Sequence, residues 1–489
     1  MKIKSVSIKN FRGIEKLDSP IELSDLSVFI GDNATCKTTI LEAINFCLSP
    51  SFSASRLCIN DFYQGSDREI EITIEFAENF IAKLPDGYTT QDVECNKVAL
   101  IAKKRDRSAP QKAFSDLVSM SHYVVPVAQR GEEGWSQPRK SSSNDFKFTE
   151  RQLSFPVPDV ELPRCFYFPK TRSRQLSKGY NSSLSNIIDD LNWRFDKSQR
   201  TKPEDQHFKH DRKNLHEKVI SETGGDTIKK TIEESNKILK ELGIDQINLS
   251  LFKTLTPYDG AELLFPFDGF ELPIGQSGSG IEMAVSLVFL ETLAKISKEK
   301  ILIVIDEPEL HLHPTLQDKI INHLKSISDE IQIVVSTHSP FLFKNVYHDR
   351  AVNLLLTKKE AGRFIIEDAR SSQFGLLKWS PSWGEICYFA YDLPTPEFHD
   401  DLYSSLQDKN GTETIAGTEA WLIANGQNKE IKWTDDKGNQ IEETIMTYIR
   451  NRIHHSDNQN RPEYTVEQLR DSIQRMINLL RPAKTGATT

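Results

Sequence analysis

The chain has 489 residues, with 61 Lys and Arg against 70 Asp and Glu, and hydrophobic residues make up 38% of it. This length suits about two to four domains. The net charge of −9 argues against a generally basic surface for nucleic acid, although it is compatible with a local basic groove. No run reaches the roughly 18 apolar residues of a membrane helix, and the opening MKIKSVSIKN resembles a strand rather than a secretory signal. We therefore expect a cytoplasmic protein that does not engage a membrane.

The cysteines are scattered and none belongs to a C-x-x-C pair. Their positions are Cys36, Cys47, Cys58, Cys95, Cys165 and Cys387. This distribution disfavours both a disulfide framework and a zinc ribbon, and it suits a reducing compartment.

The first half of the chain predicts strands, loops and one helix. The predicted elements are a strand and turn at 6–17, a strand at 26–30, a helix at 38–48, and paired strands at 70–76 and 98–104. Residues 105–160 are polar and rich in Ser, Pro and Arg, so we expect long surface loops there.

The second half alternates strands with helices. The predicted elements are strands at 165–168, 247–253, 262–265, 301–305 and 331–336, and helices at 280–296 and 315–328. Residues 175–245 are charged and helical but lack sustained heptads, so we expect a helical insertion without a long coiled-coil arm. Such alternation is typical of an α/β fold with a parallel sheet. From about residue 371 the segments become aromatic and helical, which predicts a second region over 371–489.

A phosphate loop is predicted between the strand at 26–30 and the helix that follows. GDNATCKT, residues 31–38, nearly matches G-x-x-x-x-G-K-[ST], in which backbone N–H groups and a helix N-terminus hold phosphates. We expect Lys37 to reach the β- and γ-phosphates and Thr38 to bind Mg²⁺. Cys36 replaces the usual Gly, and its Cβ is expected to crowd the phosphates or to strain the backbone. The nucleotide-binding candidates here are Gly31, Asn33, Cys36, Lys37, Thr38 and Thr39.

Two further strand ends carry chemistry. ILIVIDEP, residues 301–308, ends in two carboxylates, and ligands of open α/β sheets bind at strand C-termini. We expect Asp306 to hold Mg²⁺ through water and Glu307 to polarise the attacking water. His338 follows the next apolar strand and can contact a γ-phosphate. Ser279 and Gly280 open a helix, where small residues suit a phosphate.

In this order, the motifs resemble the ATP-binding-cassette (ABC) ATPases of the RecF/SMC/OLD type. The resemblance rests on IKNFRGIEKL, LSVFIGDNATCKTTILEAINF, GQSGSGIEMAVSLVFLETL, ILIVIDEPELHLHP and VVSTHSPFLF, which lie between residues 1 and 370. It implies an ABC-type ATPase head over 1–370 with ATP and Mg²⁺ as cofactors. It also implies a head-to-head dimer or higher oligomer in which Ser279 and Gly280 act in trans. No acidic Toprim-like pattern follows His338, and the compact head is most similar to the PtuA-like ATPases of Septu and certain retron modules.

The C-terminal region holds one more candidate site. Arg450 and His455 follow a segment, 440–449, that predicts a helix, and their spacing resembles the R-x4-6-H motif of HEPN-domain ribonucleases. In such an enzyme the His serves as acid and base, while the Arg stabilises the charged phosphate. The alternative is a basic helix end that docks a partner or nucleic acid, and we favour it.

Three functions are therefore open. The first is the ATPase subunit of an anti-phage defence system, which senses infection and controls a separate nuclease such as an HNH protein. The second is a self-contained, ATP-gated ribonuclease that uses Arg450 and His455. The third, more weakly supported, is a RecF-like DNA repair ATPase. DNA or tRNA is the nucleic acid that we expect as a partner.

Overall fold

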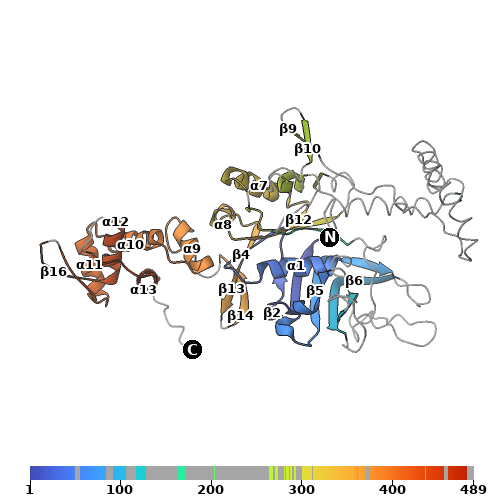
Figure 1. Cartoon of the computed structure of the whole chain (residues 1–489), viewed down its shortest axis with the longest axis horizontal. Helices are drawn as coiled ribbons and strands as arrows, with labels where there is room; N and C mark the ends of the chain where they lie inside the picture. The colour runs from blue at the N-terminus through green and yellow to red at the C-terminus, as the bar shows by residue number, and fades with distance from the viewer. Residues whose placement is uncertain are drawn as a thin grey trace, which may run out of the picture. The chain divides into compact units, whose positions relative to one another are not determined.

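The structure is a computed structural model of the chain, shown in Figure 1. It describes residues 1–49, 56–83, 92–105, 117–127, 162–170, 203, 264–267, 270–273, 280, 282–285, 287–288, 291–292, 300–310, 312–360, 362–370, 374–435, 437–455 and 461–481. The chain forms two compact units, one made of Met1–Thr171 with Leu287–Thr489 and the other of Arg172–Ser286.

An antiparallel sheet of six strands opens the chain. Its strands are β1 (Ile3–Phe11), β2 (Ile14–Lys16), β3 (Ile21–Glu22), β5 (Ile70–Lys83), β6 (Asp92–Lys104) and β7 (Val118–Pro126). They lie in the order β2-β1-β5-β6-β7, with β3 also on β1. The predicted pairing of β5 with β6 is confirmed. The prediction of loops throughout 105–160 is wrong for β7, because Val118, Met120 and Val124 give this stretch a local strand pattern that pairs with β6, although the segment as a whole is polar.

A second sheet of six strands carries the phosphate loop. Its strands are β4 (Leu26–Gly31), β8 (Arg164–Phe168), β11 (Ile301–Asp306), β12 (Gln332–Thr337), β13 (Val352–Glu360) and β14 (Arg363–Asp368). The order is β14-β13-β4-β12-β11-β8, and every pair is parallel except β13 with β14. Strands β4, β11 and β12 are buried along their whole length, as central parallel strands should be. The predicted α/β class with a mixed sheet is confirmed.

Helix α1 (Lys37–Leu48) contacts strands of both sheets and joins them into one hydrophobic core. Its inward residues include Ile40, Leu41 and Ile44, all buried. The buried Gln332 on β12 adds a polar link between the sheets. Its Oε1 accepts from Ile3 N at 2.6 Å, and its Nε2 donates to Ile3 O at 2.7 Å.

Shorter elements occur between these strands along the chain. They are the 3-10 turns η1 (Ile59–Asp61) and η2 (Tyr63–Gly65), the hairpin β9 (Leu264–Phe267) with β10 (Phe270–Pro273), and helices α7 (Pro314–Ile327) and α8 (Pro340–Tyr347). Helices α7 and α8 begin with Pro, which is tolerated there because the first N–H groups of a helix have no intrahelical acceptor.

The C-terminal region is mainly helical, as predicted. Its elements are α9 (Trp383–Tyr391), α10 (Pro396–Asn410), α11 (Ile415–Ala424), the hairpin β15 (Ile431–Thr434) with β16 (Gln440–Glu443), α12 (Ile445–His454) and α13 (Val466–Leu480). A core that includes Leu402, Tyr403 and Ile473 holds the helices together. The predicted helix at 440–449 begins late, because residues 440–443 pair with β15 and Thr444 caps α12.

Some predictions fall on residues that the structure does not describe. These are the strand at 247–253, Ser279 of the signature loop, and all of the helical insertion at 175–245 except residue 203. The boundary near residue 371 stays a prediction. In the described part of the chain, no helix has the length and hydrophobicity to cross a membrane.

Candidate nucleotide site

The phosphate loop runs from the end of β4 to the start of α1. Gly31 adopts a φ of 154°, and a Cβ there would lie 2.2 Å from the carbonyl oxygen of Thr357 on β13. Thr357 also bonds Thr35 of the loop, hydroxyl to hydroxyl at 2.7 Å. Strand β13 therefore packs against the phosphate loop through Thr357, and only glycine fits at position 31, where the loop begins.

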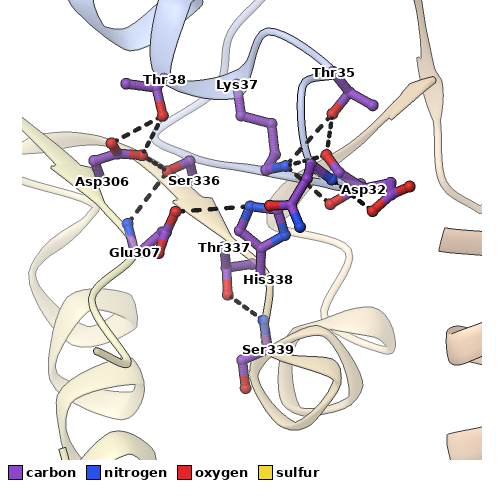
Figure 2. A network of polar contacts seen from close by, with 12 residues as sticks. Asp32, Thr35, Lys37, Thr38, Asp306, Glu307, Ser336, Thr337, His338 and Ser339 are labelled. Atoms are coloured by element: carbon purple, nitrogen blue, oxygen red, sulfur yellow. Dashed lines mark hydrogen bonds and ion pairs between the residues drawn. The ribbon is translucent and has the colours of Figure 1, made fainter. Parts of the chain in front are cut away.

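Lys37 turns its ammonium group back onto the loop. Its Nζ donates to the carbonyl oxygens of Gly31 at 2.9 Å and Asp32 at 2.8 Å, and it lies 3.4 Å from the Thr35 hydroxyl (Figure 2). The residue is only 4% exposed. Burial lowers the pKa of Lys37 to about 8, against the opposing effect of nearby carboxylates. The cation is therefore poorly solvated, and phosphate oxygens at the same position would stabilise it.

Cys36 occupies a left-handed backbone conformation, with φ 67° and ψ 14°. This conformation costs an L-residue about 1–2 kcal/mol, so the predicted backbone strain is present. The thiol packs toward Gly13, where an added Cβ would lie 2.9 Å from Sγ. Burial raises the pKa of Cys36 to about 11, so the thiol stays protonated at neutral pH. The side chain is a packing group and a poor nucleophile.

Asp306 brings the loop and two strand ends together. The Thr38 hydroxyl donates to its carboxylate at 3.0 and 3.2 Å, and the Ser336 hydroxyl at the end of β12 donates to it as well (Figure 2). Asp306 is 1% exposed. A carboxylate beside a threonine hydroxyl offers the oxygen ligands that Mg²⁺ prefers, so Thr38 and Asp306 fit the predicted metal.

Glu307 and His338 face each other across this edge. Glu307 has a positive φ of 54° and donates its backbone N–H to Ser336 O at 3.0 Å. Its Oε1 lies 3.7 Å from Nε2 of His338. Burial first, and then the charge of Lys37, lowers the pKa of His338 to about 4. A neutral imidazole at pH 7 has one N–H to donate.

Glu309 completes the site, although sequence reasoning assigned it no role. One carboxylate oxygen accepts from the Thr337 hydroxyl and from the backbone N–H of His338, both at 2.8 Å. Burial raises the pKa of Glu309. The available signal was its position two residues after Glu307, in the same acidic motif. Glu309 holds the loop that presents His338.

The remaining nucleotide candidates are less informative. The Asn33 N–H donates to the Asp32 side chain at 2.6 Å, and Thr39 lies in the first turn of α1. Gly280 is helical and buried, but it belongs to the other compact unit.

Arg450 and His455 lie at the end of α12, and in the described part of the chain no hydrogen bond or ion pair joins them. Arg450 donates to the Asn451 side chain at 3.3 Å, and Asn451 in turn donates to Glu443 at 3.0 Å. His455 is the exposed residue that ends α12. Their role stays a prediction.

A family model described as an AAA ATPase domain matches residues 1–343. A relative named OLD nuclease, from Thermus scotoductus, is 26% identical over 77% of this chain and 66% of its own length. The Retron Vc95 probable ATPase of Vibrio cholerae serotype O1 biovar El Tor is 21% identical over 77% of each chain. Septu protein PtuA of Bacillus mycoides is 26% identical over 30% of this chain and 24% of its own length. The chain therefore spans less than two thirds of the OLD nuclease. The predicted resemblance to OLD- and PtuA-type ATPases is confirmed.

Proposed function

The chain belongs to the AAA ATPase domain family and is an ATPase, and we propose that it is the ATPase subunit of an anti-phage defence system that controls a nuclease effector. The observation that carries the ATPase chemistry is the convergence of Lys37, Thr38, Asp306, Glu307 and His338 at one edge of the second sheet. Relatives whose names place them in retron and Septu systems support the defence role.

Each residue of the site has a separate role in ATP hydrolysis. Lys37 exchanges the carbonyls of Gly31 and Asp32 for phosphate oxygens. Thr38 and Asp306 would hold Mg²⁺, which supplies charge neutralisation of the phosphates. Glu307 accepts a proton from the attacking water, and the N–H of neutral His338 donates to the γ-phosphate.

The oligomer and the partner follow from the same proposal. Two heads pair around ATP, and the segment holding Ser279 and Gly280 completes the site of the other subunit. A separately encoded nuclease, such as an HNH protein, docks on the assembly. The part of the chain that resembles the OLD nuclease covers 66% of that relative, so its nuclease activity is not carried over to this chain.

The C-terminal pair suits docking better than catalysis. Asn451, beside Arg450, is engaged by Glu443, and Glu443 also accepts from Trp433 Nε1 at 3.1 Å. These contacts tie α12 to the β15–β16 hairpin, which is a structural use of the segment. The exposed His455 is free of such ties among the described contacts, so the end of α12 is a surface available to a partner.

The test compares the parental protein with Lys37→Ala in three assays. These assays are ATP hydrolysis, plating of phages on cells that carry the gene with its neighbours, and co-purification with the neighbouring gene product. We expect the parent to hydrolyse ATP, reduce plating and retain a nuclease, and the variant to lose the first two activities. Phage plating that is unaffected by the intact locus would overturn the defence role. A parent that does not hydrolyse ATP would overturn the whole proposal.

A further inference from the structure

A tyrosine from the C-terminal region lies against the histidine of the nucleotide site. Tyr391 is the last residue of α9, and its ring centroid lies 6.4 Å from that of His338, with the planes tilted by 30°. Helix α9 also contacts β4 and β13, the strands that lead to and support the phosphate loop. The first helix after the head is therefore in direct contact with a residue that we expect to meet the γ-phosphate.

Two buried polar atoms in this neighbourhood have no hydrogen-bond partner among the residues that the structure describes. One is the hydroxyl of Tyr391, and the other is the second carboxylate oxygen, Oε2, of Glu309. The first oxygen of Glu309 already holds the Thr337 hydroxyl and the His338 N–H. Burial and then the charge of Glu309 raise the pKa of Tyr391, which places the two groups within electrostatic reach of each other.

Buried polar groups without partners are uncommon because each one has lost its bonds to water. The Tyr391 hydroxyl is a donor and Oε2 of Glu309 is an acceptor. A second conformation in which the hydroxyl donates to Oε2 would satisfy both. Both residues are held at the His338 loop, Tyr391 by its ring against that of His338 and Glu309 by its bonds to Thr337 and His338.

Helix α9 is well placed to transmit such a movement. The ring of Phe374 packs against that of Phe343 on α8 at a centroid distance of 5.0 Å, and edge to face against that of Phe389 on α9 at 5.6 Å. Helix α8 begins at Pro340, directly after His338 and Ser339. A shift of the His338 loop therefore acts on α9 both through Tyr391 and through α8.

We propose that Tyr391 is a positioning residue of the ATPase site, whose hydroxyl bonds Glu309 when His338 engages the γ-phosphate and which thereby links the nucleotide state to α9. The inference rests on the proposed ATPase mechanism. According to this inference, the nucleotide state of the ATP site affects α9 in the C-terminal region, a coupling that the family resemblance does not imply.

The test uses Tyr391→Phe, which keeps the ring and removes the hydroxyl, with Tyr388→Phe on the same helix as the matched control. Tyr388 donates to Gln474 at 3.2 Å on the surface. We expect Tyr391→Phe to bind ATP within about twofold of the parent but to lower kcat about fivefold or more, while Tyr388→Phe leaves both unchanged. Without nucleotide, Tyr391→Phe should melt no lower than the parent, because it removes a hydroxyl that has no partner.

Two further readouts separate positioning from packing. In a Glu309→Gln background, Tyr391→Phe should lower kcat no further, because both substitutions break the same bond. ATP should slow amide hydrogen exchange in α9 of the parent and leave it unchanged in Tyr391→Phe. Parental kcat in Tyr391→Phe, or independent effects of the two substitutions, would overturn the inference and leave the ATPase function intact. A parent without ATP hydrolysis would overturn both.

Discussion

ATP binding should take up a proton at mildly alkaline pH, and Lys37 is the reason. Its pKa is lowered from the ordinary 10.5 to about 8 by burial. That lowering means that the charged form of Lys37 is destabilised, relative to the neutral form, by about 3 kcal/mol in the nucleotide-free protein. Between pH 8 and 10.5 the unfolded chain binds more protons at this residue than the folded one, so the free energy of unfolding rises with pH across this window. Phosphate oxygens beside Nζ reverse the shift, and the complex keeps Lys37 charged.

The expected magnitude follows from the fraction of Lys37 that is already protonated. If the pKa of the bound state lies well above 9, apparent ATP affinity should fall about tenfold between pH 7 and pH 9. At pH 8, binding should take up about half a proton. No other group of the loop competes in this range, because the pKa of Cys36 is raised to about 11 and that of His338 is lowered to about 4.

Calorimetry can measure both quantities. ATP is titrated into the Glu307→Gln variant, so that hydrolysis does not interfere, at pH 7, 8 and 9 in two buffers of different ionisation enthalpy. Lys37→Arg serves as the control, because an arginine stays charged throughout and should remove the pH dependence of binding. An affinity that is constant from pH 7 to pH 9, with no proton uptake at pH 8, would refute the reasoning.

Four variants test the residue assignments. Lys37→Ala should abolish ATP binding, and unchanged affinity by calorimetry would contradict the site assignment. Glu307→Gln should keep ATP binding, reduce turnover on the order of 10²- to 10⁴-fold and prolong the ATP-bound dimer in size-exclusion chromatography; hydrolysis at the parental rate would exclude Glu307 as the base. Cys36→Gly should preserve or raise ATPase activity and change the free energy of unfolding by less than about 1 kcal/mol, because relief of the left-handed strain is offset by the greater freedom of unfolded glycine. A large loss of activity would show instead that Cys36 is adapted to slow turnover. Arg450→Ala combined with His455→Ala should weaken docking of a partner and leave ATP hydrolysis intact. Metal-independent RNA cleavage by the parent, lost in this double variant, would show that the pair is catalytic.

The local parts of the nucleotide site could be predicted from the sequence, because each is contiguous in the chain. An apolar strand, a loop with Gly31 and Lys37, and a helix with apolar spacing lie within residues 26–48. The same holds for Asp306 and Glu307 after a buried strand. The alternation of strands and helices likewise predicted the parallel sheet. This prediction works because apolar residues at every second position are buried on one face of a strand, whereas those at every third or fourth position are buried on one face of a helix.

The tertiary structure decided how these parts meet. Strand β12 lies between β4 and β11, and this order places Ser336 and Thr38 on the carboxylate of Asp306. Strand β7 forms because a local run of strand-forming residues pairs with β6, although the surrounding segment is polar. The role of Arg450 and His455 stays a prediction.

The pKa of Lys37 and the contacts between distant segments also depend on the tertiary structure. The sequence identifies Lys37 as the lysine of a phosphate loop but not its pKa, which burial in the folded chain lowers. Tyr391 comes from a segment with no nucleotide motif and reaches His338 only because α9 packs on α8. Sequence spacing determines which groups share a strand end or a loop, whereas solvent exclusion and contacts between distant segments exist only once the chain has folded.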